Sequence, residues 1–264
     1  MKAVTDTELA KAIAHADNLL RTAIEVVGHA HTHITLDQTW ARNPKVIAVT
    51  ILCRSITNFR ASLLLVQQEQ ALEARVLVRL MYENLLWLAA LRERGAAFVE
   101  DMRKDEAFNR SALAEMTLKI TASYGADVDA PGALQLRSII NNLRNEFPTP
   151  KKLQADKIAA VGPVGIAYVT YSQLSLDAVH CSVTALGRHL TSNHMKENHE
   201  LVLSVIPNIP PRERFSTVLH ACRALMGAAV AANELLGFTS ETGSLAALMA
   251  EFEANGWQNW EWTT

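Results

Sequence analysis

The sequence has 264 residues, of which 49% are hydrophobic and 20% are charged, and its formal net charge is −2. That length allows a sizeable core, and the weak net charge excludes a global attraction to nucleic acid or to acidic membranes. Cys53, Cys181 and Cys222 lie far apart, which argues against a disulfide framework and favours reduced thiols. Acidic residues within the first twenty positions argue against a signal peptide. We therefore expect a soluble, cytoplasmic protein without membrane partners.

Few glycines (11) and prolines (8), together with many residues of high helix propensity, predict an all-α protein. Apolar residues at helical spacing predict a single irregular bundle of seven or eight helices. The predicted helices lie at about 5–28, 44–68, 71–94, 96–124, 136–147, 166–191, from the prolines near 210 to 236, and at 243–254. No segment resembles a linker, so we expect one domain over residues 1–264 with a short Trp-rich tail at 256–264.

Two irregular segments carry distinctive side chains. The clearest predicted loop, 148–165, contains a mild basic patch made of Lys151, Lys152 and Lys157. The tail contains Trp257, Trp260 and Trp262, which would form an unusual apolar patch if they were left in water. We expect the tail to pack on the body of its own chain, with burial against a second subunit as the alternative.

The third predicted helix contains a charged pair inside an otherwise apolar run, Val76–Leu91. Arg79 and Glu83 are four residues apart and therefore lie on the same face. A helix that is apolar around its circumference is buried on all sides, and buried charges must be paired. The pair is either a core ion pair that sets the register of the helix or part of an interior polar site for a ligand.

The helix predicted at 166–191 carries a polar stripe opposite its apolar face. The stripe consists of Gln173, Asp177, His180, Thr184 and Arg188, which fall within about a quarter-turn of one another. Asp177 precedes His180 by three residues, so its carboxylate can orient the imidazole and raise its basicity. The stripe fits a solvated helix face, a site shared with another helix, or an oligomer interface.

Two helical motifs contain most of these polar residues. They are Arg79 and Glu83 in the third predicted helix, and Tyr171, Ser175, Asp177 and His180 in the sixth. Together they resemble a family of uncharacterised bacterial helical proteins, known as a domain of unknown function (five-six-seven-seven), over about residues 50–195. The resemblance implies a helical fold and no established activity. It also implies that these residues, Asp177 excepted, form the polar core of the family.

A second, more distant resemblance provides an enzymatic alternative. Helical, metal-independent ribonucleases of the HEPN superfamily, from bacterial defence and toxin–antitoxin systems, carry an Arg that is followed by a His after about four to six intervening residues. These two side chains promote attack of a 2′-hydroxyl on the scissile phosphate of RNA. Two segments have that spacing, Arg188 with His189 and His194, and Arg214 with His220. Two such matches are expected by chance, so only the helical context favours this alternative.

No cofactor and no metal site is predicted. His29, His31 and His33 alternate on an irregular segment, whereas zinc requires three or four converging ligands with supporting contacts. The main hypothesis is therefore a non-enzymatic structural, regulatory or binding module. Its small-molecule ligand is unidentified, a second copy of the chain is a candidate partner, and RNA is a partner only for the ribonuclease alternative.

Overall fold

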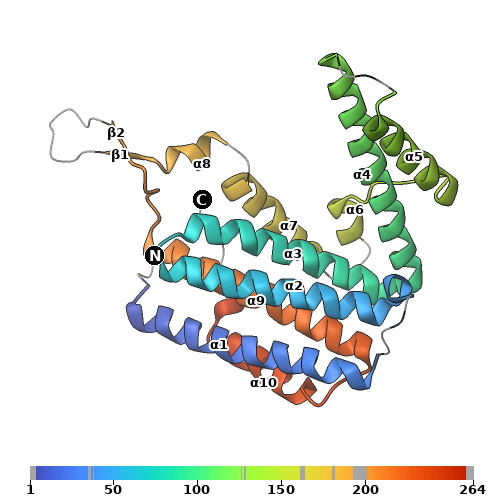
Figure 1. Ribbon diagram of the computed structural model, residues 1–264. Helices are drawn as coiled ribbons and strands as arrows, with labels where there is room; N and C mark the ends of the chain where they lie inside the picture. Colours follow the sequence, from blue (N-terminus) through green and yellow to red (C-terminus); the bar gives the residue numbers. More distant parts are fainter. Residues whose placement is uncertain are drawn as a thin grey trace.

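The computed structural model describes residues 4–34, 37, 39–125, 127, 129–160, 164–179, 182–192 and 201–259. Within these residues the fold is all-α, as predicted, with ten α-helices and one two-stranded antiparallel sheet (Figure 1). The helices are α1 (Asp6–His29), α2 (Pro44–Gln67), α3 (Ala71–Arg94), α4 (Ala96–Ser123), α5 (Pro131–Glu146), α6 (Ala155–Ala159), α7 (Gly165–Leu174), α8 (Val183–Gly187), α9 (Pro211–Leu236) and α10 (Thr242–Ala254). The sheet pairs β1 (Leu190–Ser192) with β2 (Leu201–Leu203).

Local capping signals explain where the long helices begin and end. Thr5 and Glu8 form the predicted capping box at the start of α1. Asn43 precedes α2 as its N-cap, and its side chain accepts a hydrogen bond from the backbone N–H of Lys45. Pro44 is the first residue of the helix, a position that favours proline. Gly95 ends α3 with a φ of 51°, a conformation that favours glycine. The predicted boundaries of these helices are therefore confirmed to within a few residues.

Helices α1, α2, α3 and α9 pack against one another around the main hydrophobic core, and α10 packs against α1 and α9 (Figure 1). The most enclosed helix is α9, in which seventeen of 26 residues are buried. Many of these residues are alanines, whose small side chains allow neighbouring helices to approach closely. Gly227 extends this pattern, because a Cβ atom there would lie 2.8 Å from Cδ1 of Leu85 on α3.

The expectation that α3 is buried on all sides is wrong. Arg79, Leu80, Glu83 and Trp87 form a partly exposed face of α3. The reason is that α4 leaves the body soon after Gly95 and pairs with α5 to form a projecting arm, so it does not cover this face (Figure 1). Arg103 on α4 donates to Glu146 at the end of α5 at 2.7 Å, which ties the two arm helices together.

The single helix predicted at 166–191 is divided into several pieces. After α7 the chain makes a π-helical turn, Ser175–Val179, and a new helix begins at Ser182, whose hydroxyl accepts a hydrogen bond from Ala185 N–H at 3.1 Å. A π-helical turn adds a residue to the helical repeat and rotates the following side chains. The predicted polar stripe is therefore not continuous, although Asp177 and Arg188 still meet. Residue 180 lies outside the described residues.

The described part of the tail packs on the body of its own chain. Trp257 is 6% exposed and lies edge-on to Phe215 on α9 and to Phe252 on α10. Arg223 donates a hydrogen bond to the backbone carbonyl of Trp257 at 2.9 Å. The expected packing of the tail thus holds for Trp257, while Trp260 and Trp262 lie outside the described residues.

Two described helices, α2 and α9, are long and apolar enough to cross a membrane by length and composition alone. The apolar window of α9 is 83% buried inside the protein, which is the behaviour of a core helix. The corresponding window of α2 is 44% buried. These two helices are weak evidence for a membrane protein, because core helices of soluble proteins meet the same criteria.

Candidate functional site

Arg79 and Glu83 form the centre of a polar cluster on the partly exposed face of α3. The Arg79 guanidinium donates to Glu83 Oε2 at 2.6 Å, to Ser175 Oγ at 3.2 Å and to the Tyr171 hydroxyl. Its carbon Cζ also lies 4.4 Å from the centroid of the Tyr171 ring, within the range of a cation–π contact. The Arg79 and Glu83 side chains are 20% and 34% exposed, so the pair is neither in bulk water nor fully buried.

Four residues of the predicted polar set therefore meet in space, namely Arg79, Glu83, Tyr171 and Ser175. Ser175 is oriented within its own helix, because its hydroxyl also donates to the Tyr171 carbonyl at 2.9 Å. These contacts join the end of α7 to the middle of α3. Each of the three guanidinium nitrogens of Arg79 donates to a neighbouring side chain, so the cluster clamps α3 to α7 and the π-helical turn.

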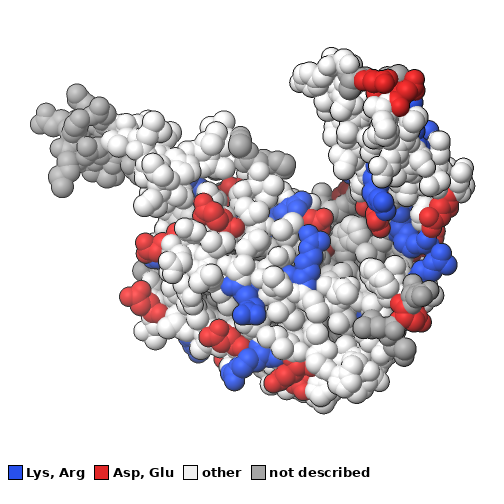
Figure 2. All heavy atoms as spheres, viewed as in Figure 1, with Lys and Arg blue, Asp and Glu red and all other residues white. Residues whose placement is uncertain are grey.

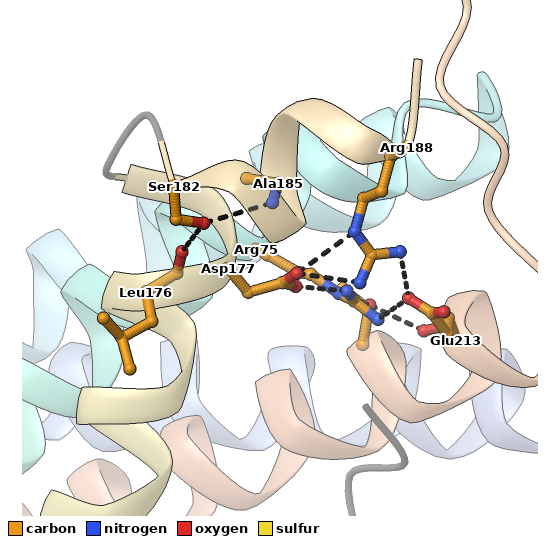
Figure 3. A network of polar contacts seen from close by, with 8 residues as sticks. Arg75, Leu176, Asp177, Ser182, Ala185, Arg188 and Glu213 are labelled. Carbon is orange, nitrogen blue, oxygen red and sulfur yellow. Dashed lines mark hydrogen bonds and ion pairs between the residues drawn. The ribbon is translucent and has the colours of Figure 1, made fainter. Parts of the chain in front are cut away.

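One turn earlier on α3, Arg75 is the centre of a second network (Figure 3). Its guanidinium is fully buried and binds Asp177 Oδ2, Glu213 Oε2 at 2.8 Å and Thr217 Oγ1 at 3.2 Å. Arg188 binds the same two carboxylates, with contacts of 2.7 Å to Asp177 Oδ1 and 2.7 Å to Glu213 Oε2. Two guanidinium groups and two carboxylates thus balance one another where the π-helical turn, α3 and α9 meet.

The opposite charges of this largely buried network stabilise one another. Burial lowers the pKa of Arg75, while the carboxylates of Asp177 and Glu213 oppose that shift. Burial also works against the charge of Arg188, but its hydrogen bonds to Asp177 raise its pKa above the ordinary value. Both arginines therefore stay charged at neutral pH. Glu213 and Thr217 were not among the predicted site residues.

A cavity of about 280 Å³ lies between α3, α7 and α9. Its walls are mainly apolar and include Leu85, Ala89, Ile166, Ala167, Gly227, Val230 and Ala231. Polar groups converge on it from Tyr82, Thr170 and Arg223, and from an ion pair in which Arg92 Nε lies 2.5 Å from Glu234 Oε2. An apolar cavity with a few convergent polar groups is the usual form of a small-molecule site.

Tyr82, one of the polar residues that line the cavity, is hydrogen-bonded to a buried histidine. Tyr82 and His220 share a hydrogen bond of 3.0 Å between the hydroxyl and Nδ1. Burial raises the pKa of Tyr82 to about 12. Burial, together with the positive charges of Arg223 and Arg75, lowers the pKa of His220 well below 6.5. Both side chains are therefore neutral at pH 7.

The described residues of the two predicted ribonuclease pairs contact other groups of the protein. Arg188 is engaged by two carboxylates, His189 Nδ1 lies 3.0 Å from the Ser204 carbonyl oxygen, and His194 lies outside the described residues. Arg214 pairs with Glu69 at 3.0 Å, whereas His220 contacts Tyr82 in the core. Six residues on a helix correspond to about 240° of rotation, so the Arg214 and His220 side chains point to different sides of α9.

The histidines and cysteines of the described residues form no metal cluster. Within that part of the chain no group of three or more His, Cys, Asp or Glu side chains could hold a metal ion. His29 lies 3.1 Å from the Ser240 hydroxyl, and His31 contacts the Gly28 carbonyl oxygen. Cys222 is buried in α9, and burial raises the pKa of its thiol. Cys53 is exposed on α2, whereas Cys181 and His180 lie outside the described residues.

Comparison with known proteins identifies one family. The family model described as "Family of unknown function (DUF5677)" matches residues 45–198, which is more than half of the chain. Comparisons with curated proteins and with solved structures gave no match. The matched range contains the Arg79 cluster, three of the four charged groups of the Arg75 network, and two of the three walls of the cavity. The chain belongs to this family of unknown function, DUF5677.

Proposed function

We propose that the protein is a non-enzymatic binding module that holds a small amphipathic anion in the cavity between α3, α7 and α9. The observation that carries this proposal is the cavity itself, with apolar walls and a cationic rim. Its volume of about 280 Å³ exceeds that of the engineered cavity of roughly 150 Å³ known to take up benzene. It therefore has room for a ligand with a short apolar body.

The polar groups indicate the charge of the ligand. Arg92, Arg223 and Glu234 line the cavity, so two positive charges face one negative charge there. The Arg92 and Glu234 side chains are 45% and 26% exposed, which places this ion pair near solvent, at the rim. Tyr82 and Thr170 provide uncharged groups. A ligand with an anionic head at the cationic rim and an apolar tail between the apolar walls would match both parts of the cavity.

Octanoate is a suitable probe, because it combines a carboxylate with a short hydrocarbon tail. We expect saturable binding in isothermal titration calorimetry, with a negative heat-capacity change from burial of apolar surface. The uncharged analogue octanol should bind more weakly. Absence of octanoate binding at millimolar concentration would remove the proposal.

Three variants, one of them a control, test the location of the bound octanoate. Ala231→Phe should fill the cavity and abolish binding, whereas Ala112→Phe, at an exposed position on α4, should leave binding unchanged. Arg92→Gln should weaken octanoate binding about fivefold and leave octanol binding unaltered, since a single partly solvated charge is removed. Circular dichroism of each variant confirms that it is folded. Unchanged binding by folded Ala231→Phe would place the ligand elsewhere.

The remaining expectations are proposals that rest on the sequence. We propose a cytoplasmic location and a bacterial origin, supported by the free thiols of Cys53 and Cys222 and by the family resemblance. The metal-independent ribonuclease remains an alternative prediction. Its direct test is incubation of RNA with the purified protein, beside Arg188→Ala and Arg214→Ala variants. Cleavage by the parent that is lost in one variant would support it, and no cleavage by the parent would remove it.

A further inference from the structure

We propose that a second pocket, at the junction of α3, α4 and α6, binds a phosphate group. This basic pocket is defined by Arg94, Lys104, Lys151, Lys152 and Lys157. Asp101, Leu153, Gln154 and Ile158 complete its lining, and its volume is about 100 Å³. Lys and Arg side chains gather at the base of the projecting arm, as the space-filling view shows (Figure 2).

The charge of the basic pocket is not balanced within the described residues. Arg94 is paired with Asp101, which leaves four lysines around the pocket for which the described residues supply no acidic partner. The projecting arm differs from the basic pocket, because acidic side chains close by neutralise its ion-paired arginines. These pairs are Arg103 with Glu100 and Glu146, Arg110 with Glu106, Arg137 with Asp129, and Arg144 with Glu115. Net positive charge is therefore concentrated at the pocket.

The segment that carries Lys151, Lys152 and Lys157 is fixed to α4 and to the hydrophobic core. The backbone N–H of Leu153 donates to Asp105 Oδ1 on α4 at 2.7 Å. Ile158, one residue after Lys157, is 7% exposed and joins the hydrophobic core. The lysine stems therefore start from fixed backbone positions, while their ammonium groups remain in solvent. Such an arrangement lowers the entropic cost of gathering several cations around one anion.

The size of the pocket favours a compact anion with more than one charge. A single tetrahedral phosphate fits a space of about 100 Å³, and lysine ammonium groups bind phosphate as point charges. A nucleic acid would instead require a row of unpaired cations along its backbone. The arginines of the arm are occupied by acids, so we favour free phosphate or a small phosphate ester over a polymer.

The test uses the full chain with inorganic phosphate, adenosine monophosphate and a single-stranded RNA in separate titrations. Inorganic phosphate should bind at millimolar or lower concentration, as followed by calorimetry, and sulfate should compete. The Lys104→Gln/Lys157→Gln double variant should bind about tenfold more weakly, because two nearby positive charges are removed. Lys119→Gln, an exposed lysine farther along α4, is the matched control and should bind like the parent.

The results of these titrations distinguish free phosphate, a small phosphate ester and RNA as the ligand of the basic pocket. Tighter binding of adenosine monophosphate than of inorganic phosphate would identify a small ester as the ligand. Tighter binding of RNA than of either, lost in the double variant, would overturn the small-ligand assignment in favour of a polymer. Phosphate binding that is absent, or equal in the parent and the double variant, would overturn the proposal. Octanoate binding should not change in the double variant, so this proposal and the proposed function fail independently.

A different observation carries a second proposal, about the surface around α8 and the sheet. Ten of the twenty-three large apolar residues that are exposed among the described residues lie in this short stretch of chain. They are Leu176, Val179, Val183, Leu186, Leu190, Leu201, Val202, Leu203, Val205 and Ile206. Val183, Leu203 and Val205 are 88%, 81% and 95% exposed. We infer that this apolar projection is an interface with a second copy of the chain.

The total surface area agrees with an incomplete assembly. The chain exposes 14958 Å², whereas a compact monomer of 29.0 kDa is expected to expose about 11,400 Å². The excess is about 3,560 Å² per chain, whereas an obligate homodimer buries roughly 2,000 to 5,000 Å² over both chains, or about 1,000 to 2,500 Å² of each, so dimer formation would remove part of the excess. A two-stranded sheet is also marginal by itself in water and is stabilised by further strands or by packing.

The chemistry of the apolar projection favours a copy of itself. Within 182–192 and 201–206 the described residues include no Lys, Asp or Glu, and Arg188 is already neutralised by two carboxylates. Among these described residues, a partner with complementary charge would find no unpaired Lys, Asp or Glu to bind. Two identical edge strands can pair in antiparallel fashion about a two-fold axis, which makes such an edge complementary to itself.

Sedimentation equilibrium at micromolar concentration tests this interface. We expect the parent to have the mass of a dimer and Val183→Asp/Leu203→Asp to have that of a monomer. Leu113→Asp/Met116→Asp, which places the same charges on the exposed face of α4, should remain a dimer. A monomeric parent would overturn the proposal. So would a parent that sediments with phosphatidylglycerol vesicles only when the apolar projection is intact, since a lipid surface would then be its occupant.

Discussion

The Tyr82 hydroxyl lies 3.0 Å from Nδ1 of His220 in the interior between α3 and α9. Tyr82 is 1% exposed and His220 is 2% exposed, so neither group can exchange this bond for one to bulk water. Tyr82 also lines the cavity, whereas His220 is not among its lining residues. The hydrogen bond therefore connects the proposed ligand site to the packing of the two central helices.

Removing the Tyr82 hydroxyl should destabilise the fold. Tyr82→Phe keeps the ring but takes a buried partner away from His220, which costs about 1–3 kcal/mol of unfolding free energy. Urea denaturation followed by circular dichroism measures the loss. Tyr124→Phe is the control, because that ring is 86% exposed and its substitution should have no effect. Equal stability of Tyr82→Phe and the parent would contradict a stabilising role for the bond.

The buried state of His220 predicts a dependence of stability on pH. Its pKa in the folded protein is well below 6.5, so below about pH 6.5 the unfolded chain binds a proton that the folded chain does not. The free energy of unfolding should therefore fall as the pH decreases from 6.5, by up to about 1.4 kcal/mol per pH unit, and level off below the folded pKa. Urea titrations between pH 5 and 8 measure this slope.

The variant His220→Gln separates this histidine from the other titrating groups. Gln keeps a polar side chain of similar length but takes up no proton in this range. The slope of stability against pH below 6.5 should become smaller in the variant. The same slope in variant and parent would assign the pH dependence to other histidines.

Much of the fold could be predicted because its determinants are local. The capping box at Thr5 and the glycine at position 95 mark helix ends within a few residues of sequence. The break after Leu174 could not be predicted in this way. The π-helical turn that follows carries Asp177, and the contacts of Asp177 are to residues on other helices. Tertiary ion pairing therefore overrides the helical pattern there.

The candidate site was only partly predictable for the same reason. Arg79 and Glu83 are one turn apart, so their pairing follows from local spacing, whereas Tyr171 and Ser175 were named only through the family resemblance. Thr217, in contrast, is 142 residues from Arg75, and no local pattern connects them. The cavity could not be predicted either, because it is bounded by three helices from separate parts of the sequence.

The two arginines of the buried network should differ in their effects on stability. Arg75→Met removes a fully buried cation and leaves two carboxylates with one guanidinium, at a cost of about 3–5 kcal/mol. Arg188→Met should cost less, because its side chain is 15% exposed and Arg75 still binds both acids. Arg110→Met, in an exposed pair on α4, should change stability by less than about 1 kcal/mol. Urea denaturation ranks the three, and equal losses for Arg75→Met and Arg188→Met would contradict the network.

Gly227 provides a test that separates binding from stability. The Cβ of Gly227→Ala would lie 2.8 Å from Leu85 Cδ1, so the Leu85 side chain must move. Leu85 borders the cavity and can rotate into it, and alanine favours the helix over glycine by about 1 kcal/mol. We therefore expect stability close to that of the parent but weaker octanoate binding, because Leu85 then occupies part of the ligand volume.

A control variant changes a distant glycine, and a double variant at positions 227 and 85 tests whether octanoate binding can be restored. Gly243→Ala, on α10 with no atom within 4 Å of the added Cβ, should leave octanoate binding unchanged. The Gly227→Ala/Leu85→Ala double variant removes the displaced side chain and should restore binding, although it loses buried apolar contacts and becomes less stable. Calorimetry measures binding and urea denaturation measures stability. If Gly227→Ala lost stability and kept its affinity for octanoate, Leu85 would not move into the cavity, and the cavity would not be the octanoate site.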